Sequence, residues 1–329
     1  MMREETLAEN AWRIEDGLYR ILLPLGGPLP FVNVYLVESR GQRMLVDAGL
    51  DAEPSLRALG RALKAIGVPP KGLDLLLLTH RHPDHAAGQA AVRARWGGRA
   101  LLHPRDLAPR EDGPAAARAW AERHGVPAGR IARFLAGRRD PPGGSLAGVE
   151  PLDPTAPLRV GDLAFDVIEV PGHAGGQVML RERDRGWLVT ADQVVESEAP
   201  NVWMAPGVEG DPLSAYLESL RRTERVAASL VLPGHGPPAR GGPGEQVRRQ
   251  LAFQERYLGA VQATLPPGGA TTWEVAQRVA PGRDDPSPLA EVAAALTHLE
   301  VLGRVRRAGG RWCGATVEDV HSAGRSSDG

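Results

Sequence analysis

Cysteine, lysine and long apolar runs are scarce in this chain of 329 residues. Cys313 is its single cysteine, which excludes a framework of intrachain disulfides and any zinc site built from several thiolates. A bound metal would have to take histidine and carboxylate ligands, and the chain has nine histidines. No apolar run reaches the roughly 18 residues of a membrane-spanning helix. The N-terminus also lacks the basic and apolar regions of a signal peptide, so we expect a cytoplasmic protein with no membrane partner.

An excess of one charge is lacking too. The formal net charge is −1, so the chain has no overall basic field that would attract nucleic acid. Lys64 and Lys71 are the only lysines, and every other basic residue is arginine. A coding bias explains this excess without a function, and we attach no binding role to it as a whole.

Buried strands alternate with helices along most of the chain. Leucines at helical spacing predict a helix over 53–66, and the continuous apolar run 73–80 is typical of a strand buried on both faces. This alternation predicts an α/β layered fold. The other predicted strands are 18–25, 31–39, 43–49, 99–104, 163–170, 177–183, 187–191 and 229–236. The other predicted helices of this part are 86–96, 114–124, 128–136, 211–227 and 243–262.

Two changes in composition divide the chain. Residues 105–150 interrupt the alternation with two short helices and a Gly/Pro-rich stretch, which we interpret as an insertion over the active site. After the linker 266–269, helices over 271–280 and 287–303 and a hairpin at Gly309-Gly310 predict a small winged-helix domain, with Ser287 as a helix N-cap. The expected parts are a lead-in 1–11, a catalytic domain 12–264, a winged-helix domain 265–315 and a disordered tail 316–329.

Four side chains capable of binding metal stand within six residues at the end of the buried strand 73–80. Residues i and i+2 of an extended backbone point to one side, so His80 and His82 can bind one ion while Asp84 and His85 serve a second. Buried imidazole and carboxylate groups need partners, and packing alone does not require this density. The segment therefore predicts a metal site at a strand end, where α/β folds place ligand-binding groups.

Four further motifs follow predicted strands in the same way. They are Val46-Asp47-Ala48-Gly49, Pro171-Gly172-His173, Thr190-Ala191-Asp192 and Pro233-Gly234-His235-Gly236. A lone histidine at a strand end is usually a surface residue. Several such motifs, together with the cluster at His80, favour one shared site.

In order, these motifs resemble the five-motif signature of the metallo-β-lactamase superfamily, over about residues 12–262. The resemblance implies a four-layer αβ/βα sandwich with a dinuclear metal site at its edge. The implied ligands of the first ion are His80, His82 and His173. The implied ligands of the second ion are Asp84, His85 and His235, with Asp192 bridging the two ions. Asp47 would orient the ligands without binding an ion.

The implied ligand set suits zinc, and iron or manganese fit it as well. Two such ions can share a water and lower its pKa towards neutrality. The bridging hydroxide would attack an ester, thioester, amide or phosphodiester, and the ions would stabilise the developing negative charge. Asp84 and Asp192 are the expected catalytic residues, with Asp84 orienting the hydroxide and moving its proton.

A departure from the signature reduces the number of branches of the superfamily to which the chain could belong. True β-lactamases carry Cys or Ser at the position of Asp192, which argues against lactam hydrolysis. We expect hydrolysis of a small-molecule ester or thioester, as in glyoxalase-II-like enzymes. The alternatives are an endoribonuclease for single-stranded RNA, because a winged-helix relative acts on such RNA, and a mononuclear iron persulfide dioxygenase. Metal content separates the dioxygenase from the other two, and substrate assays separate those.

Two further segments carry weaker signals. Asn201, Trp203 and Met204, in the loop after Asp192, are expected to line the substrate pocket, with core packing as the alternative for Trp203 and Met204. The predicted hairpin carries Arg304, Arg306, Arg307 and Arg311 beside Trp312. These residues could contact the phosphates and bases of a nucleic acid. We favour a solvated hairpin with Trp312 in a small core, serving an intramolecular or homodimer contact.

Overall fold

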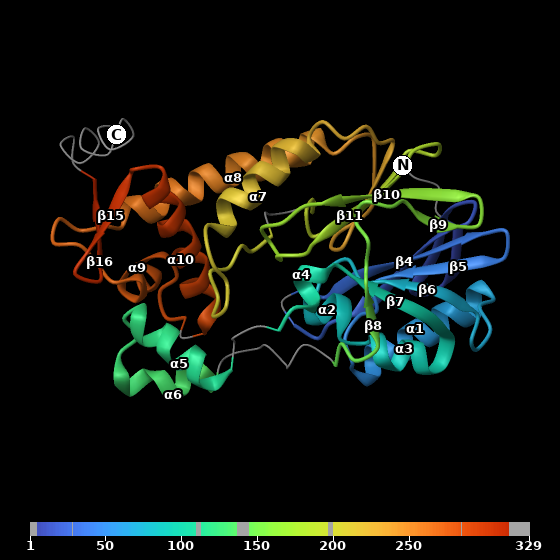
Figure 1. Cartoon of the computed structure of the whole chain (residues 1–329), viewed down its shortest axis with the longest axis horizontal. Helices are drawn as coiled ribbons and strands as arrows, with labels where there is room; N and C mark the ends of the chain where they lie inside the picture. Colours follow the sequence, from blue (N-terminus) through green and yellow to red (C-terminus); the bar gives the residue numbers. More distant parts are fainter. Residues whose placement is uncertain are drawn as a thin grey trace. The chain divides into compact units, whose positions relative to one another are not determined.

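The computed structural model describes residues 5–27, 29–109, 113–136, 145–196, 200–283 and 285–315 (Figure 1). The chain divides into two compact units. Unit 1 comprises Met1–Ala108, Asp140–Pro200 and Glu218–Arg249. Unit 2 comprises Pro109–Arg139, Asn201–Leu217 and Gln250–Gly329. The expected tail 316–329 lies outside the described residues.

An eight-stranded sheet forms the first half of unit 1 (Figure 1). Its strands follow one another in sequence order, antiparallel from β1 to β5 and parallel from β5 to β8. They are β1 (Glu5–Ala8), β2 (Ala11–Glu15), β3 (Leu18–Pro24), β4 (Phe31–Ser39), β5 (Gln42–Val46), β6 (Leu73–Leu77), β7 (Gly97–Leu102) and β8 (Val149–Pro151). The first strand uses residues 5–8 of the expected lead-in.

A six-stranded sheet forms the second half of unit 1, in the order β14-β13-β12-β11-β10-β9. Its neighbours are antiparallel except for β12 and β13, which are parallel. The strands are β9 (Leu158–Val160), β10 (Leu163–Glu169), β11 (Val178–Glu182), β12 (Trp187–Ala191), β13 (Leu230–Pro233) and β14 (Ala239–Arg240).

The two sheets of unit 1 pack face to face around a shared core. Alternate residues of β4 serve opposite faces, because side chains alternate along a strand. Tyr35 and Val37 join the core between the sheets, to which the second sheet contributes Phe165 and Trp187. Val34, from the opposite face of β4, belongs to a separate core formed with helices. Those helices are α1 (Glu53–Ile66) and α3 (Gln89–Trp96), which cover that face (Figure 1).

The predicted helix 53–66 has the predicted bounds, and Gly67 ends it in the left-handed conformation at φ 94°. The predicted helix 86–96 is instead two pieces, α2 (Pro83–Ala86) and α3, because Ala87 and Gly88 separate them. Helix α4 (Pro104–Leu107) also belongs to unit 1. Helices α7 (Pro212–Thr223) and α8 (Gly244–Ala263) each have residues in both units.

Unit 2 brings part of the insertion together with the C-terminal segment. Helices α5 (Pro114–Arg123) and α6 (Ala128–Ala136) come from the insertion, and α9 (Thr272–Val279) and α10 (Pro286–Val301) from the C-terminal segment. Strands β15 (Val305–Ala308) and β16 (Arg311–Gly314) form the predicted hairpin. The backbone N–H of Trp273 donates to the carbonyl of His124 at 2.9 Å. The winged-helix assignment, the domain boundaries and the cover over the active site stay predictions.

The caps of the two C-terminal helices follow ordinary rules, with one correction. Thr271 and Glu274 form the predicted capping box of α9. The N-cap of α10 is Asp285 and not Ser287, because the Asp285 carboxylate accepts the backbone N–H of Ser287 at 3.2 Å. The N-cap prediction was wrong because both Pro286 and Pro288 suit a first helical turn, and the helix begins at Pro286.

Candidate metal centre

The seven predicted ligands come together on four segments of unit 1, which follow β6, β10, β12 and β13. His80 and His82 follow β6, and Asp84 and His85 lie in α2. Three sets have all their ligand atoms within 4.8 Å of one another. Site one is His80, His82 and His173, and site two is Asp84, His85 and His235. The third set, His80, His85 and Asp192, links the two sites.

Asp192 stands between the two sites. One of its carboxylate oxygens lies 3.3 Å from His173 Nε2 and 3.6 Å from His235 Nε2, and the other lies 3.3 Å from His85 Nε2. Gly234 permits this approach, since a Cβ there would overlap Asp192 Oδ1 and come within 2.9 Å of His85 Cε1. The arrangement is what a carboxylate shared by two ions requires.

Hydrogen bonds at Nδ1 fix the orientation of three imidazoles, those of His80, His85 and His235. His235 Nδ1 donates to the carbonyl of Phe31 at 3.0 Å, and His85 Nδ1 donates to Asp47 Oδ2 at 2.8 Å. Thr79 Oγ1 gives its own hydrogen to Asp47 Oδ2, so it accepts from His80 Nδ1 at 3.1 Å. In each ring the Nε2 lone pair is therefore left for the site.

Asp47 organises this network without lying in any of the candidate ligand sets. Its Oδ1 accepts the backbone N–H of Thr79 at 2.8 Å, and its Oδ2 accepts from Thr79 Oγ1 and His85 Nδ1. The residue is 2% exposed and its backbone is left-handed, at φ 68°. These contacts are of the kind expected for a residue that orients ligands.

Burial and neighbouring charges set the protonation of the cluster. Burial lowers the pKa of His80 well below its usual range, and burial together with His173 lowers the pKa of His82 to about 3. Burial opposes the charge of His85, but the carboxylates of Asp192 and Asp84 raise its pKa well above the usual range. Burial likewise opposes ionisation of Asp84, but His85 and His235 lower its pKa to about 2. His80 and His82 of site one are thus neutral imidazoles, and Asp84 of site two is an ionised carboxylate.

The buried polar atoms that face the cluster fit a metal centre. His80 Nε2, His85 Nε2, His235 Nε2 and Asp192 Oδ1 make no hydrogen bond within the described part of the chain. Leaving such atoms without partners is costly, and metal coordination removes that cost. Nitrogen and oxygen donors in this number suit zinc, iron or manganese. These His and Asp residues are thus positioned for a metal site.

Two residues of β4 that sequence reasoning missed hold the loop of His235. The buried side chain of Asn33 donates from Nδ2 to the carbonyls of Pro233 and Gly236, at 2.8 and 2.6 Å. Tyr35 donates its hydroxyl to the same Pro233 carbonyl at 2.9 Å. The sequence signal was the polar Asn33 within the apolar strand 31–39, since a buried amide needs partners.

The three expected pocket residues belong to unit 2, and their role stays a prediction. The indole N–H of Trp203 donates to Glu291 at 3.4 Å, and the backbone N–H of Met204 donates to the carbonyl of Ala290 at 3.0 Å. Both contacts are to α10. Asn201 is exposed.

The arginines of the hairpin contact other residues of unit 2. Arg304 pairs with Glu255 at 3.1 Å and Arg311 with Glu274 at 2.9 Å. Arg307 lies over the ring of Trp312, 5.3 Å from its centroid. Trp312 is only 2% exposed and donates its indole N–H to Thr272 Oγ1, so its ring is not available for stacking on a base. These contacts of Arg304, Arg307 and Arg311 are intramolecular, and the role of the hairpin stays a prediction.

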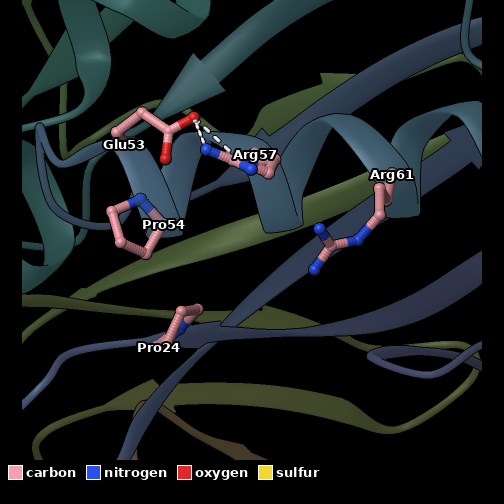
Figure 2. Close-up of a pocket in the computed structure, with 5 residues that line it drawn as sticks. All are labelled: Pro24, Glu53, Pro54, Arg57 and Arg61. Carbon is pink, nitrogen blue, oxygen red and sulfur yellow. Dashed lines mark hydrogen bonds and ion pairs between the residues drawn. The ribbon is translucent and has the colours of Figure 1, made fainter.

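A surface pocket of about 390 Å³ lies apart from the ligand set (Figure 2). Pro24, Pro54 and residues of α1 line it, and Figure 2 shows Arg57 turned towards Glu53, with which it forms an ion pair. None of the predicted ligands lines this pocket. Its lining includes none of the residues of the candidate metal sites.

Comparison with known proteins agrees with the geometry. Residues 27–235 match the family model of the metallo-beta-lactamase superfamily. The chain is 25% identical to the probable metallo-hydrolase YqjP of Bacillus subtilis over 320 residues, which cover 88% of this chain and 94% of that protein. It is 27% identical to the acyl-coenzyme A thioesterase MBLAC2 of Gallus gallus over 221 residues, covering 62% of this chain and 72% of that protein.

A solved structure shares the fold. The metallo-beta-lactamase family protein TTHA1429 of Thermus thermophilus superposes with a TM-score of 0.81 at 28% sequence identity, covering 92% of this chain and all of that one. The predicted α/β fold of the superfamily is thereby confirmed. In the described part of the chain, no helix is long and apolar enough to cross a membrane. Because the family model matches more than half of the chain, the chain belongs to the metallo-β-lactamase superfamily.

Proposed function

We propose that the protein is a dinuclear metal-dependent hydrolase that acts on a small-molecule thioester. The observation that carries the proposal is the convergence of sites one and two on Asp192, with imidazole nitrogens that lack hydrogen-bond partners aimed between them. The thioester class is supported by the relative named as an acyl-coenzyme A thioesterase. Asp192 in place of Cys or Ser supports it too, because it argues against lactam hydrolysis.

The protein's own residues would hold and orient the reacting groups. Site one and site two would each hold a divalent ion, with Asp192 shared. When bound, two such ions lower the pKa of a water and polarise the carbonyl that it attacks. Fixed Nδ1 partners keep the imidazoles from turning, so the ligands need no rearrangement during turnover.

Asp84 would also handle the proton. Its side chain is 24% exposed, more than that of any other carboxylate in the cluster, and its Oδ2 lies 3.2 Å from His235 Nε2. His85 and His235 keep the pKa of this carboxyl low, so it is ionised at neutral pH. An ionised oxygen at the solvent side can accept the proton of the attacking water.

Metal analysis followed by a substrate panel tests the proposal. We expect two divalent ions per chain, with zinc as the best-suited metal, and hydrolysis of a thioester such as an acyl-coenzyme A or a hydroxyacylglutathione, the substrates in the names of two relatives. Asp192→Ala should abolish turnover and retain the fold, whereas the exposed Asp162→Ala should leave turnover unchanged. A single iron with consumption of a persulfide would establish the dioxygenase instead. Faster cleavage of single-stranded RNA than of any thioester would establish the ribonuclease.

A further inference from the structure

A buried carboxylate outside the ligand sets contacts both loops that carry site one. Asp106 lies in α4 and is 2% exposed. Its Oδ2 accepts the backbone N–H of Arg81, between His80 and His82, at 2.9 Å. Its Oδ1 accepts the backbone N–H of Gly176, three residues after His173, at 2.8 Å. One side chain thus ties the β6 loop to the loop between β10 and β11.

The surroundings of Asp106 leave it no other evident task. No Lys, Arg or His side chain of the described residues forms an ion pair with it, so its charge is met by peptide N–H groups. Such charge-assisted bonds are stronger than neutral ones. The backbone at Gly176 comes close enough only because it has no side chain, since a Cβ there would lie 2.9 Å from Asp106 Cγ.

Site two is supported by a different carboxylate. Asp47 binds His85 Nδ1 directly, and the backbone N–H of Ala48 donates to the carbonyl of His85 at 2.7 Å. The hydrogen bonds of Asp106 within the described residues go to the two loops of site one, and none goes to a ligand of site two. Asp47 also reaches site one through Thr79, next to His80, whereas the hydrogen bonds of Asp106 among the described residues serve the loops of site one and no ligand of site two.

We propose that Asp106 is a positioning residue that sets the spacing between the ligand pair His80/His82 and His173, and so sets metal affinity at site one alone. The inference rests on the two-ion site proposed above. Removal of the carboxylate leaves two buried N–H groups without partners and lets the loops separate. Loss of a residue that supports a metal ligand costs about 10- to 100-fold in affinity. Affinity at site two should stay within about twofold, because among the described residues Asp106 makes no hydrogen bond to a ligand of that site.

Cobalt titration of the purified full chain tests this proposal. Wild type should take up two equivalents of Co²⁺, followed by the visible absorption of the ion and by competition with a chelator. Asp106→Ala and Asp106→Asn should keep one tight ion and weaken the other by about 10-fold or more. Asn retains the shape of Asp and one acceptor, so it controls for a loss of packing. Asp153→Ala is the matched control, because that exposed carboxylate also accepts two donors, both from Thr155.

Ligand variants identify which site is weakened. In a His235→Ala background, which leaves site one, Asp106→Ala should weaken the remaining ion. In a His82→Ala background, which leaves site two, Asp106→Ala should have no further effect. Thermal unfolding of the metal-free variants reports on the fold. Equal weakening of both ions, or unchanged binding of both, would overturn the role of Asp106.

Failure of the two-ion function gives a different result. If wild type takes up a single equivalent of Co²⁺, the dinuclear hydrolase is refuted whatever Asp106 does. The Asp106 proposal is then judged on that one ion. Loss of that ion in His82→Ala would place it at site one. Weaker binding of the same ion in Asp106→Ala would then support the proposal, and unchanged binding would overturn it.

Discussion

A buried histidine of unit 2 makes the stability of that unit depend on pH. His124 follows α5 and is 8% exposed, with its ring centroid 4.5 Å from that of Trp120. Thr272 Oγ1 accepts the indole N–H of Trp312 and lies 3.0 Å from His124 Nδ1, so its own hydrogen can be donated to that nitrogen. Burial, helped by the charges of Arg307 and Arg123, lowers the pKa of His124 to about 4.

The sign and size of the effect follow from that value. An unfolded histidine has a pKa of about 6.5. Between pH 6.5 and pH 4, His124 is therefore protonated in the unfolded chain but not in the folded unit. The free energy of unfolding is highest above pH 6.5 and decreases as the pH falls through this range. Each pH unit in that window costs up to about 1.4 kcal/mol. From pH 7 to pH 5 the expected loss is about 2 kcal/mol, before most carboxylates titrate.

Denaturant unfolding read by pulsed hydrogen exchange measures this loss in peptides of α5 and α9. His124→Asn keeps an acceptor near the position of Nδ1 and removes the titrating group. Its free energy of unfolding should be lower at pH 7, because the imidazole no longer packs on Trp120, yet should change little between pH 7 and pH 5. Arg307→Gln keeps the imidazole and removes one nearby charge, so its pH-dependent loss should fall between those of wild type and His124→Asn.

Parallel pH dependence in wild type and His124→Asn would refute this reasoning. It would mean that His124 takes up its proton equally in the folded and unfolded states, so burial would not be what excludes the proton. A loss confined to peptides of unit 1 would refute it as well, since His124 contacts α9 in unit 2.

Three further predictions concern the cluster. Gly234→Ala should reduce metal affinity about 10-fold or more, measured by chelator competition, because the added Cβ would meet Asp192 and His85; full retention of both ions would contradict it. Asn33→Ala should lower the free energy of unfolding by about 1–3 kcal/mol in urea melts, because it removes the buried amide that donates to both the Pro233 and the Gly236 carbonyls; an unchanged midpoint would count against it. Neighbouring carboxylates raise the pKa of His85 and His235 in the metal-free protein, so ion binding at site two displaces protons. Site-two affinity should therefore rise up to about 10-fold per pH unit for each displaced proton. Affinity at site one should depend less on pH, because the pKa of His80 and His82 is low; equal slopes in cobalt titrations would rule this out.

Periodicity predicted the long elements well and the short ones poorly. Helix 53–66 and strand 31–39 have their predicted bounds, since an amphipathic stripe and a long apolar run are each read over many residues. Strands β8, β9 and β14 have two or three residues each, too few for any period, and they exist because a neighbouring strand offers its edge. The split of helix 86–96 depends on the tertiary contact of Gly88 with the loop at Ala48, which is invisible in the local sequence.

The clustering of the candidate ligands could be predicted because they stand in dense local motifs, whereas most of their supports could not be predicted. His80 to His85 span six residues, and each later ligand follows a glycine or alanine at a strand end. Asn33 and Asp106 act through backbone groups of loops 200 and 25 residues away, so no spacing links them to the site. Asp106 also lies at the start of the segment 105–150, whose composition predicted an insertion and gave no sign of a buried acid.

The backbone around His80 shows why such supports matter. The N–H before it, of Thr79, is held by Asp47 at 2.8 Å, and the N–H after it, of Arg81, is held by Asp106 at 2.9 Å. Two buried acids therefore fix the peptide on both sides of one ligand, from loops that come from β5 and from α4. Asp47 already accepts backbone, hydroxyl and imidazole donors, and Asp106 accepts two backbone N–H groups, so neither carboxylate is left to compete for an ion. These hydrogen bonds explain why two buried acids next to the cluster lie outside the candidate ligand sets.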